Sequence, residues 1–314
     1  MIGLASYLCF FLTVALIYGT ATLGLNLQWG SAGLFNVGVA GFAAVGAYVS
    51  AWITATPVAT HWGGFALPIP LGWAAAMAAS ALAAFIVGAT TLRLRADYLA
   101  ITTFGAAISL ELVALNADSI TGGPFGIAFI PRPFAALSDS PLAFSAANMA
   151  LVACVCGAVF LGLERLTRSP WGRVLRALRE DEAAAASLGK SPDKFRLQAF
   201  VIGAALMGLA GAMQAQFFGF IAPDNYLPVF TFQVWVMLVL GGSGNNKGAL
   251  LGAVVVWGVW TASGSLFNAL LSPEWQSRGA ALRVVGIGVV LAGVLLWRPR
   301  GLLGEQAPVS RHGG

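Results

Sequence analysis

Charged side chains are scarce in this chain. Lys and Arg together number 17 and Asp and Glu 12 among 314 residues, so 9% of the residues are charged. About 25% is usual in a soluble domain. Residues 1–92 contain no Lys, Arg, Asp or Glu at all. Because 58% of the residues are hydrophobic, the composition excludes an ordinary soluble domain and indicates a protein that lies largely in lipid.

The chain also lacks the side chains that a catalytic or metal site needs. Its three cysteines, Cys9, Cys154 and Cys156, all fall in apolar runs, where we expect them to be small buried hydrophobes. The sequence shows no Ser/His/Asp or metal-ligand constellation. The glycine-rich run 241–248 lacks the Gly-Lys-Ser/Thr ending of a phosphate loop. We therefore expect no enzyme activity, metal or cofactor on this chain.

Apolar runs recur from end to end, and most are long enough to cross a hydrocarbon core of about 30 Å. Lipid requires such runs to be helices or a closed barrel, and the strict alternation typical of a barrel is absent. The sequence predicts an all-α polytopic membrane protein with about eight or nine transmembrane or re-entrant helices. The predicted segments are 4–25, 31–55, 66–92, 98–116, 144–163, 197–220, 229–242, 248–271 and 280–297.

Three of these segments call for comment. Segment 4–25 lacks a basic leader and a clear cleavage site, so we interpret it as a retained helix. Segment 31–55 is interrupted by glycines and segment 229–242 is short, so each is either a span or a re-entrant or broken helix. Residues 1–303 form one predicted transmembrane domain, and residues 304–314 a polar tail.

Basic residues in short loops predict the orientation. With nine crossings, all the basic clusters fall on one side of the membrane, which is then cytoplasmic. These clusters are Arg93 with Arg95, the loop 164–196, Lys247, and Arg298 with Arg300. The prediction places the N-terminus and the loop 117–143 outside and the C-terminus in the cytoplasm. Since few Lys or Arg lie elsewhere, nucleic acid is not an expected partner, whereas membrane lipid is.

The loop 164–196 holds 13 of the charged residues and predicts a short amphipathic helix. Pro170 suits a helix start, and Gly189 followed by Pro192 suits a stop. The predicted apolar stripe consists of Val174, Leu175, Leu178, Ala185 and Leu188, and the polar face of Arg173, Arg176, Arg179 and Glu182. Such a helix either binds lipid headgroups or docks on a protein. The acidic run 180–182 favours docking, because anionic lipid would repel it.

This loop resembles the coupling segment of ABC importer permeases. More narrowly, the chain resembles the branched-chain amino acid ABC transporter permease family and its LivM-type subunit. The motifs that carry the resemblance are GLNLQWGSAGLFNVG at 24–38, DYLAITT at 97–103, TGGPFGI at 121–127, SPWGR at 169–173 and RALREDE at 176–182 with the alanines that end at Gly189. They occur in the family's order over residues 20–302.

The resemblance implies one half of a translocation pathway for branched-chain or similar apolar amino acids in a bacterial inner membrane. It implies a second homologous permease subunit, two cytoplasmic ATPase subunits that bind the ATP, and an external solute-binding protein. The implied contacts with an ATPase are Arg173, Arg176, Glu180, Glu182, Ala184 and Gly189. Two departures from the family pattern are Ala183, where a Glu is usual, and Ile108 with Glu111, where the family often has Glu and Arg.

Polar residues in the apolar segments are candidates for the substrate pathway. They are Asn26, Gln28, Asn36, Thr102, Thr103 and Glu111. Asn26 and Asn36 are open to two interpretations, hydrogen bonds between packed helices or contact with solute. Glu111 is either a functional acid within the membrane or, because Asn116 and Asp118 follow it, a residue near the outer interface.

Small residues at four-residue spacing predict two helix-packing seams. One consists of Ala204, Gly208 and Ala212, and the other of Gly258 and Ala262.

Three alternatives to this importer remain at the level of sequence. The same machinery with urea, amide or aromatic-acid cargo keeps every feature above. A self-contained secondary transporter usually carries several embedded ionisable residues, and Glu111 is the one deep acid here. A membrane scaffold without transport would not need the amides and glycines of the first two segments.

Overall fold

The chain is almost entirely helical. The computed structural model describes residues 2–57, 62–92, 96–270 and 301–305, with single positions between 282 and 296. The longer helices are α1 (Ile2–Asn26), α2 (Val39–Thr54), α3 (Ile69–Thr91), α4 (Ala96–Asn116), α6 (Pro141–Arg168), α9 (Pro192–Phe218), α10 (Pro228–Gly241) and α11 (Asn246–Leu270). The shorter helices are α5 (Asp118–Thr121), α7 (Pro170–Glu180) and α8 (Glu182–Ser187). The two strands are β1 (Ile127–Ala128) and β2 (Phe220–Ile221).

Six helices in the described part of the chain are long and apolar enough to cross a membrane: α1, α3, α4, α6, α9 and α11. Helix α2 has 16 residues and α10 has 14. At about 1.5 Å per residue, these two are shorter than a hydrocarbon core. The prediction of an all-α polytopic membrane protein is confirmed. The exact count of eight or nine transmembrane or re-entrant helices is not confirmed, since most of segment 280–297 lies outside the described residues.

Segment 31–55 is a broken helix. A π-helix, Leu27–Ser31, continues α1, residues 32–38 then leave helical geometry, and α2 begins at Val39. Gly33 has a φ of +69°, which the turn after the π-helix requires and which favours glycine. The glycines that made this segment doubtful in the sequence therefore mark a real interruption.

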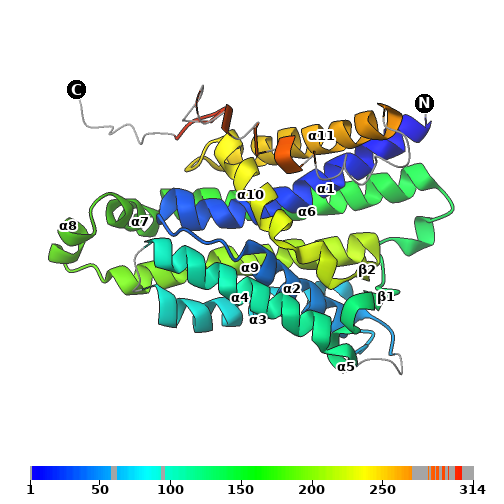
Figure 1. Ribbon diagram of the computed structural model, residues 1–314, viewed down its shortest axis with the longest axis horizontal. Helices are drawn as coiled ribbons and strands as arrows, with labels where there is room; N and C mark the ends of the chain where they lie inside the picture. Colours follow the sequence, from blue (N-terminus) through cyan, green and yellow to red (C-terminus); the bar gives the residue numbers. More distant parts are fainter. Residues whose placement is uncertain are drawn as a thin grey trace.

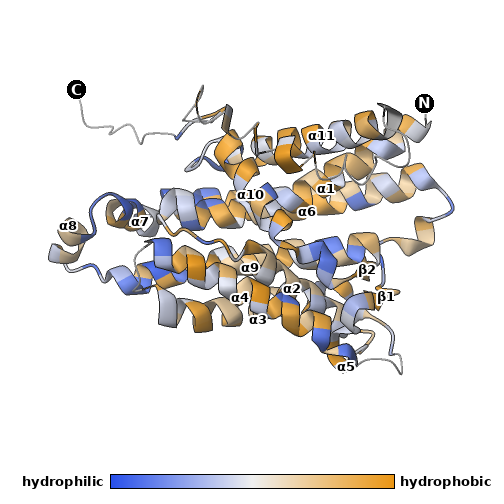
Figure 2. Ribbon diagram, viewed as in Figure 1, coloured by the Kyte–Doolittle hydropathy of each residue, from blue (hydrophilic) through white to orange (hydrophobic). Residues whose placement is uncertain are grey.

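The long helices run roughly along the longest axis of the molecule (Figure 1). Helix α9 packs against α1, α2 and α3, while α1 also packs against α6 and α11. Helices α7 and α8 project at one end, and α5, β1 and the N-terminus lie at the other (Figure 1). Apolar residues dominate the long helices, whereas hydrophilic ones gather on the α7–α8 projection (Figure 2).

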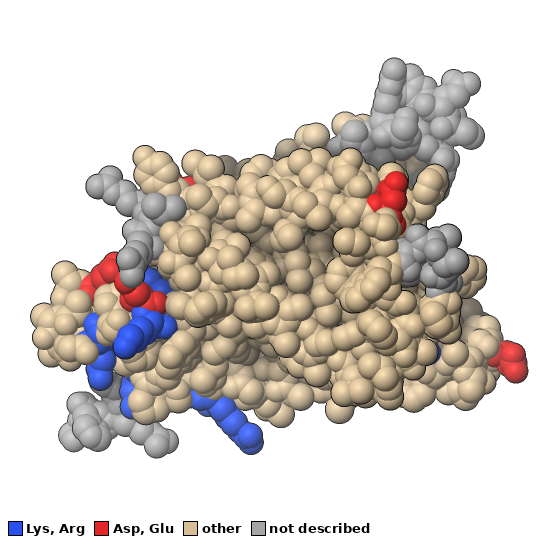
Figure 3. Space-filling model, turned by 90° about the horizontal axis from the view of Figure 1, so that it is seen from below, with Lys and Arg blue, Asp and Glu red and all other residues tan. Residues whose placement is uncertain are grey.

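Charged side chains lie toward the two ends of the molecule. In Figure 3 the Lys and Arg side chains lie toward the end that carries α7 and α8, and acidic side chains occur at both ends. An uncharged band separates them, as a hydrocarbon core requires. The basic clusters predicted at 93–95 and 298–300 lie outside the described residues. Lys247, of a third cluster, is exposed at the start of α11.

Close backbone approach holds the centre together. A Cβ atom added to Gly208 of α9 would lie 2.1 Å from Oγ of Ser80 on α3, and one added to Gly46 of α2 would lie 2.2 Å from the carbonyl oxygen of Gly208. Gly203 and Gly24 also bring α9 close to α1, since a Cβ added to Gly24 would lie 2.5 Å from the carbonyl oxygen of Gly203. Since Ala204 and Ala212 are also fully buried, the first predicted seam is confirmed.

The second predicted seam, Gly258 with Ala262, is not formed within the described chain. Ala262 is exposed, and a Cβ added to Gly258 would meet one ring atom at an ordinary 3.6 Å. Close approach on α11 occurs about two to three turns earlier. A Cβ added to Gly252 would lie 1.9 Å from the carbonyl oxygen of Met237, and Gly248 meets Gly241 in the same way. Small residues at four-residue spacing do form a seam on α11, but it consists of Gly248 and Gly252, because α10 packs on that face of the helix.

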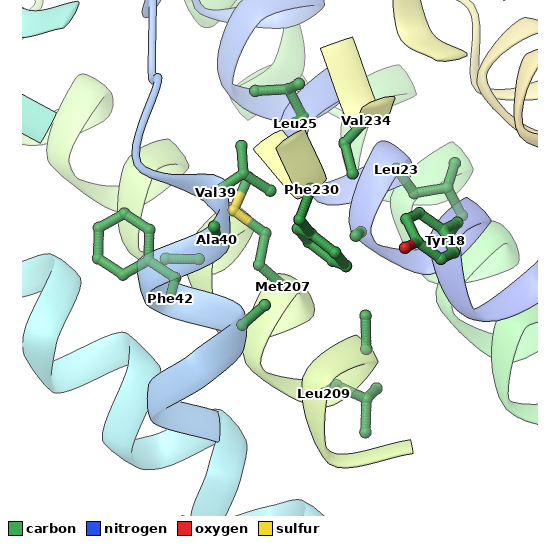
Figure 4. Packing of buried hydrophobic residues seen from close by; sticks show 14 of the residues in the cluster. Tyr18, Leu23, Leu25, Val39, Ala40, Phe42, Met207, Leu209, Phe230 and Val234 are labelled. Atoms are coloured by element: carbon green, nitrogen blue, oxygen red, sulfur yellow. The ribbon is translucent and has the colours of Figure 1, made fainter. Parts of the chain in front are cut away.

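Larger side chains fill the space beside these seams. Tyr18 of α1 meets Phe230 of α10 with ring centroids 5.0 Å apart, and Phe42 of α2 meets Phe200 of α9 edge-on at 5.6 Å. Met207 of α9 lies among residues of α2 in the same region (Figure 4). The buried cluster draws on α1, α2, α9, α10 and α11, so it fixes the short helices to the long ones.

We expect Gly208→Leu to disrupt folding and assembly, because the added side chain meets Ser80 and the backbone of Ala76 at less than contact distance. Overpacking of this kind costs about 1–3 kcal/mol or more. Yield and monodispersity in detergent measure the effect. The matched control is Gly162→Leu on α6, where nothing lies within 4 Å. Equal behaviour of the two variants would contradict the seam.

Candidate functional site

The amphipathic loop forms two helices instead of one. Helix α7 ends at Glu180, and Asp181 adopts extended backbone angles, with φ −148° and ψ 102°. Its side chain caps α8 by accepting a hydrogen bond from the N–H of Ala184 at 2.9 Å. Asp181 favours this break because a short acidic side chain satisfies a helix start better than a helix interior.

The break changes the predicted apolar stripe. Leu175, Leu178 and Ala185 are buried as expected, but Leu188 is 80% exposed. A continuous helix would have carried Leu188 onto the same face as Leu178. With the axis redirected at Asp181, the last apolar residue projects outward. The prediction for Leu188 is therefore wrong within this chain.

Most of the residues implied as ATPase contacts are on the outer surface. Arg173, Glu180, Glu182, Ala184 and Gly189 are exposed, and Gly189 ends the α8 region with a φ of +77°. Glu182 also pairs with Arg196 of α9 at 2.9 Å, which ties α8 back to the membrane helices. The two helices thus present a small-residue and mixed-charge surface beyond the uncharged band.

Arg176 is placed differently. It is half-buried and lines a polar cavity of about 240 Å³ between α7 and the ends of the membrane helices. The other residues on the cavity wall are Gly30, Ser31, Glu164, Thr167, Arg168, Gly244, Asn245, Asn246 and Glu305. Acidic and basic side chains are both present, so the cavity has a polar wall without one dominant sign of charge.

Gln28 and Asn36 lie on either side of the helix break and bond to each other. Nδ2 of Asn36 donates to Oε1 of Gln28 at 2.8 Å, and Nε2 of Gln28 donates to the carbonyl of Phe200 on α9 at 2.7 Å. Oδ1 of Asn36 accepts the N–H of Gly38 at 2.8 Å. Trp235 of α10 donates to the Asn36 carbonyl at 2.9 Å. Asn36 and Trp235 therefore provide partners for backbone groups at the break, and Gln28 connects the break to α9.

Asn26 serves the end of α1 in the same way. Its Nδ2 donates to Oδ1 of Asn246 on α11 at 2.8 Å, and its Oδ1 accepts the N–H of Gly244 at 2.8 Å. Nδ2 of Asn246 then donates to Glu164 on α6 at 3.0 Å. One chain of hydrogen bonds thus joins the ends of α1, α11 and α6 beside the polar cavity.

All three amide side chains form hydrogen bonds within the protein, as the helix-packing interpretation expects. Asn26, Gln28 and Asn36 are at most 1% exposed, and their amides bond protein groups. Contact with a solute would require these bonds to break, because a buried polar group without a partner costs about 1–3 kcal/mol.

Of the three candidates on α4, one is buried and two are partly exposed. Thr103 is buried, and its hydroxyl accepts the N–H of Val37 at 3.0 Å, which connects α4 to the non-helical residues before α2. Thr102 and Glu111 are partly exposed. Glu111 lies beside a narrow space lined by Val37, Tyr226 and Thr231, on the side of α4 that turns toward α2 and the α10 start.

Several residues of this network were missed in the sequence. Asn246, Trp235 and Thr231 all complete hydrogen bonds at the helix break. Their signal was available, because each side chain can form hydrogen bonds and lies in or beside an apolar segment. Their partners lie about 190 to 220 residues away, and the sequence spacing does not indicate such pairs.

This arrangement defines a multi-pass helical membrane protein. The charged projection of α7 and α8 lies at one end, and the hydrogen-bonded helix break at residues 32–38 lies between α1 and α2. The family model described as "Branched-chain amino acid transport system / permease component" matches residues 7–295. The chain therefore belongs to the branched-chain amino acid transport permease family, and it is a permease subunit.

Individual relatives agree over nearly the whole chain. The high-affinity branched-chain amino acid transport permease LivM of Escherichia coli K12 is 34% identical over 94% of this chain and 70% of its own length. A probable LivM of Methanocaldococcus jannaschii is 30% identical over 94% and 92%. LivH of Salmonella typhimurium is 28% identical over 93% of both chains. No solved structure matches the chain.

We expect Asn36→Ala to lower the thermal stability of the purified protein. The change leaves Gln28 and the N–H of Gly38 without their partners, at about 1–3 kcal/mol for each group that stays buried and unpaired. The midpoint of thermal unfolding in detergent measures the loss. Asn116→Ala is the control, because that exposed amide bonds only a carbonyl of its own helix, at 2.7 Å. Equal midpoints for both variants would contradict the role given to Asn36.

Proposed function

We propose that this chain forms one half of the translocation pathway of an ATP-driven importer for branched-chain or similar apolar amino acids. The observation that carries the proposal is the α7–α8 projection, a charged surface that extends beyond the uncharged band of a family member. A projection of this kind gives an ATP-hydrolysing partner a place to dock, and movement of two ATPase subunits is then passed to the membrane helices.

The proposed partners follow from the same surface and from the relatives. Salmonella typhimurium has both a LivM and a LivH, each similar to this chain over most of its length. A second homologous permease subunit therefore supplies the other half of the pathway. Two ATPase subunits contact Arg173, Glu180, Glu182, Ala184 and Gly189. An external binding protein delivers the solute, and the chain itself carries no cofactor.

The proposed location is a bacterial inner membrane, with α7 and α8 in the cytoplasm. Glu305 pairs with Arg179 of α7 at 2.7 Å, so the C-terminal part of the described chain lies at the same end. The C-terminus is then cytoplasmic, and the N-terminus, with α5 and the β1–β2 pair, is external. This orientation follows the excess of Lys and Arg at the α7–α8 end.

For the pathway we propose two roles among the six polar candidates. Thr102 and Glu111, which are partly exposed on α4, face the route of the solute. Thr103 and the three buried amides hold the wall behind it, through the hydrogen bonds across the helix break. The alternatives in cargo, namely urea, amides or aromatic acids, share this architecture and differ in what the route admits.

The test is uptake of labelled leucine by cells that lack this chain and by cells in which it is restored, with and without an ionophore. We expect uptake to depend on the chain and to survive collapse of the proton gradient while ATP is maintained. Uptake abolished by the ionophore would favour a secondary transporter. No leucine uptake in either strain would contradict the proposed cargo, and uptake of urea or an aromatic acid would then identify the alternative.

We expect Arg173→Glu to weaken capture of the ATPase subunits in a pull-down by about tenfold or more. Arg173 is exposed on α7, and a like charge placed against a docking surface costs several kcal/mol, where about 1.4 kcal/mol is a factor of ten. Lys194→Glu, an exposed reversal in the first turn of α9, is the control. Unchanged capture by Arg173→Glu would contradict the docking surface.

A further inference from the structure

Arg179 departs from the rest of the polar face of α7, because its side chain turns into the protein. The side chain is 23% exposed. Its Nη1 donates to the carbonyl of Gly30, and its Nη2 pairs with Glu305 at 2.7 Å. An arginine presents a planar fork of donors, so the two ends of one guanidinium can hold two different elements.

The first of these elements is the helix break. Gly30 lies in the π-helix that ends α1, and a helix end leaves carbonyls without partners from its own turn. Arg179 supplies such a partner from another helix. Its stem also packs across the turn, since a Cβ added to Gly33 would lie 2.9 Å from Cγ of Arg179. π-Helical turns often occur at functional sites, and this one carries both Gln28 and the start of the break.

The second element is the end of α10. The N–H groups of Leu302 and Leu303 donate to the carbonyls of Leu240 and Gly241 at 2.8 Å and 3.1 Å. Asn245 donates to the carbonyl of Gly304 at 3.1 Å. Glu305 follows directly on this segment, so its backbone is held beside the C-terminal end of α10, and its carboxylate reaches Arg179 from there.

These two elements both reach the hydrogen-bonded wall of the proposed pathway. Gln28 of the π-helix bonds Asn36, and Trp235 of α10 bonds the Asn36 carbonyl. The polar cavity of about 240 Å³ is lined by Arg176 of α7 and by Gly30 and Glu305, the two partners of Arg179. The Arg179 fork therefore joins α7 to two residues on the wall of this cavity.

We infer that Arg179 is the positioning residue that transmits displacement of α7 to the helix break and to α10, so that ATP hydrolysis by the partners changes the wall around Asn36. This inference rests on the proposed function. It differs from a docking role, because Arg179 contacts this chain and not its surroundings. Loss of the fork should leave the ATPase subunits bound and hydrolysing ATP, while less solute moves for each ATP consumed.

The experiment uses the full chain in its assembled complex with the partner subunits, reconstituted in liposomes. Leucine uptake and ATP hydrolysis are measured on the same preparation for the wild type, Arg179→Met and Arg179→Lys. Met keeps an apolar stem over Gly33 but removes the charge and the planar fork of donors. Lys keeps a stem and the positive charge but lacks the fork. We expect leucine moved per ATP to fall about fivefold or more in Arg179→Met, the low end of a usual coupling energy, and less in Arg179→Lys.

Lys194→Met is the matched control, because it removes an exposed cation from the first turn of α9. We expect its ratio of leucine to ATP to equal that of the wild type. An unchanged ratio in Arg179→Met, or a proportional fall in both rates, would overturn the transmission role, since a docking or folding defect lowers both together. No ATP-dependent uptake by the wild type would instead overturn the proposed function and this inference with it.

Discussion

Close approach of backbones around α9 is the constraint on which the other features depend. Lipid tails are as apolar as leucine, so apolar burial alone does not drive helices together, and packing contacts must do so. Gly208 makes room for both Ser80 of α3 and Gly46 of α2, and Gly203 does the same toward α1. Three helices thus meet α9 at nearly backbone distance. The short helix α2 is held in the bundle by these contacts, although it is too short to span.

A second constraint is that backbone groups freed inside the bundle need partners. The chain leaves helical geometry between Ser31 and Val39, where Ala32, Leu34 and Asn36 are buried. Gln28, Asn36 and Thr103 provide donors and acceptors at this place, and Thr231 accepts the N–H of Ala40 at the start of α2. An interruption that would be costly in lipid is therefore tolerated, because side chains from α4, α9 and α10 close around it.

The sequence predicted the class of fold, most of the spans and the first packing seam, because these depend on local composition and spacing. It predicted the charged loop for the same reason. The break at Asp181 was missed, because the helix start at α8 competes with continuation of α7 and periodicity does not show which prevails. The seam on α11 was misplaced, since α10 decides which glycines are used. Asn246 was missed because its partner Asn26 is 220 residues away.

The inward turn of Arg179 follows from these constraints taken together. The π-helix that ends α1 leaves the carbonyl of Gly30 available to a donor from another helix. Gly33, which has no side chain, leaves room for the stem of that donor. The loop between α6 and α9 begins beside this end, because Glu164 of α6 bonds Asn246, which in turn bonds Asn26 at the end of α1. A weakly hydrated guanidinium suits such a half-buried carbonyl better than a lysine ammonium does. The side chain of Arg179 thereby joins the exposed surface of α7 to the helix break at the end of α1.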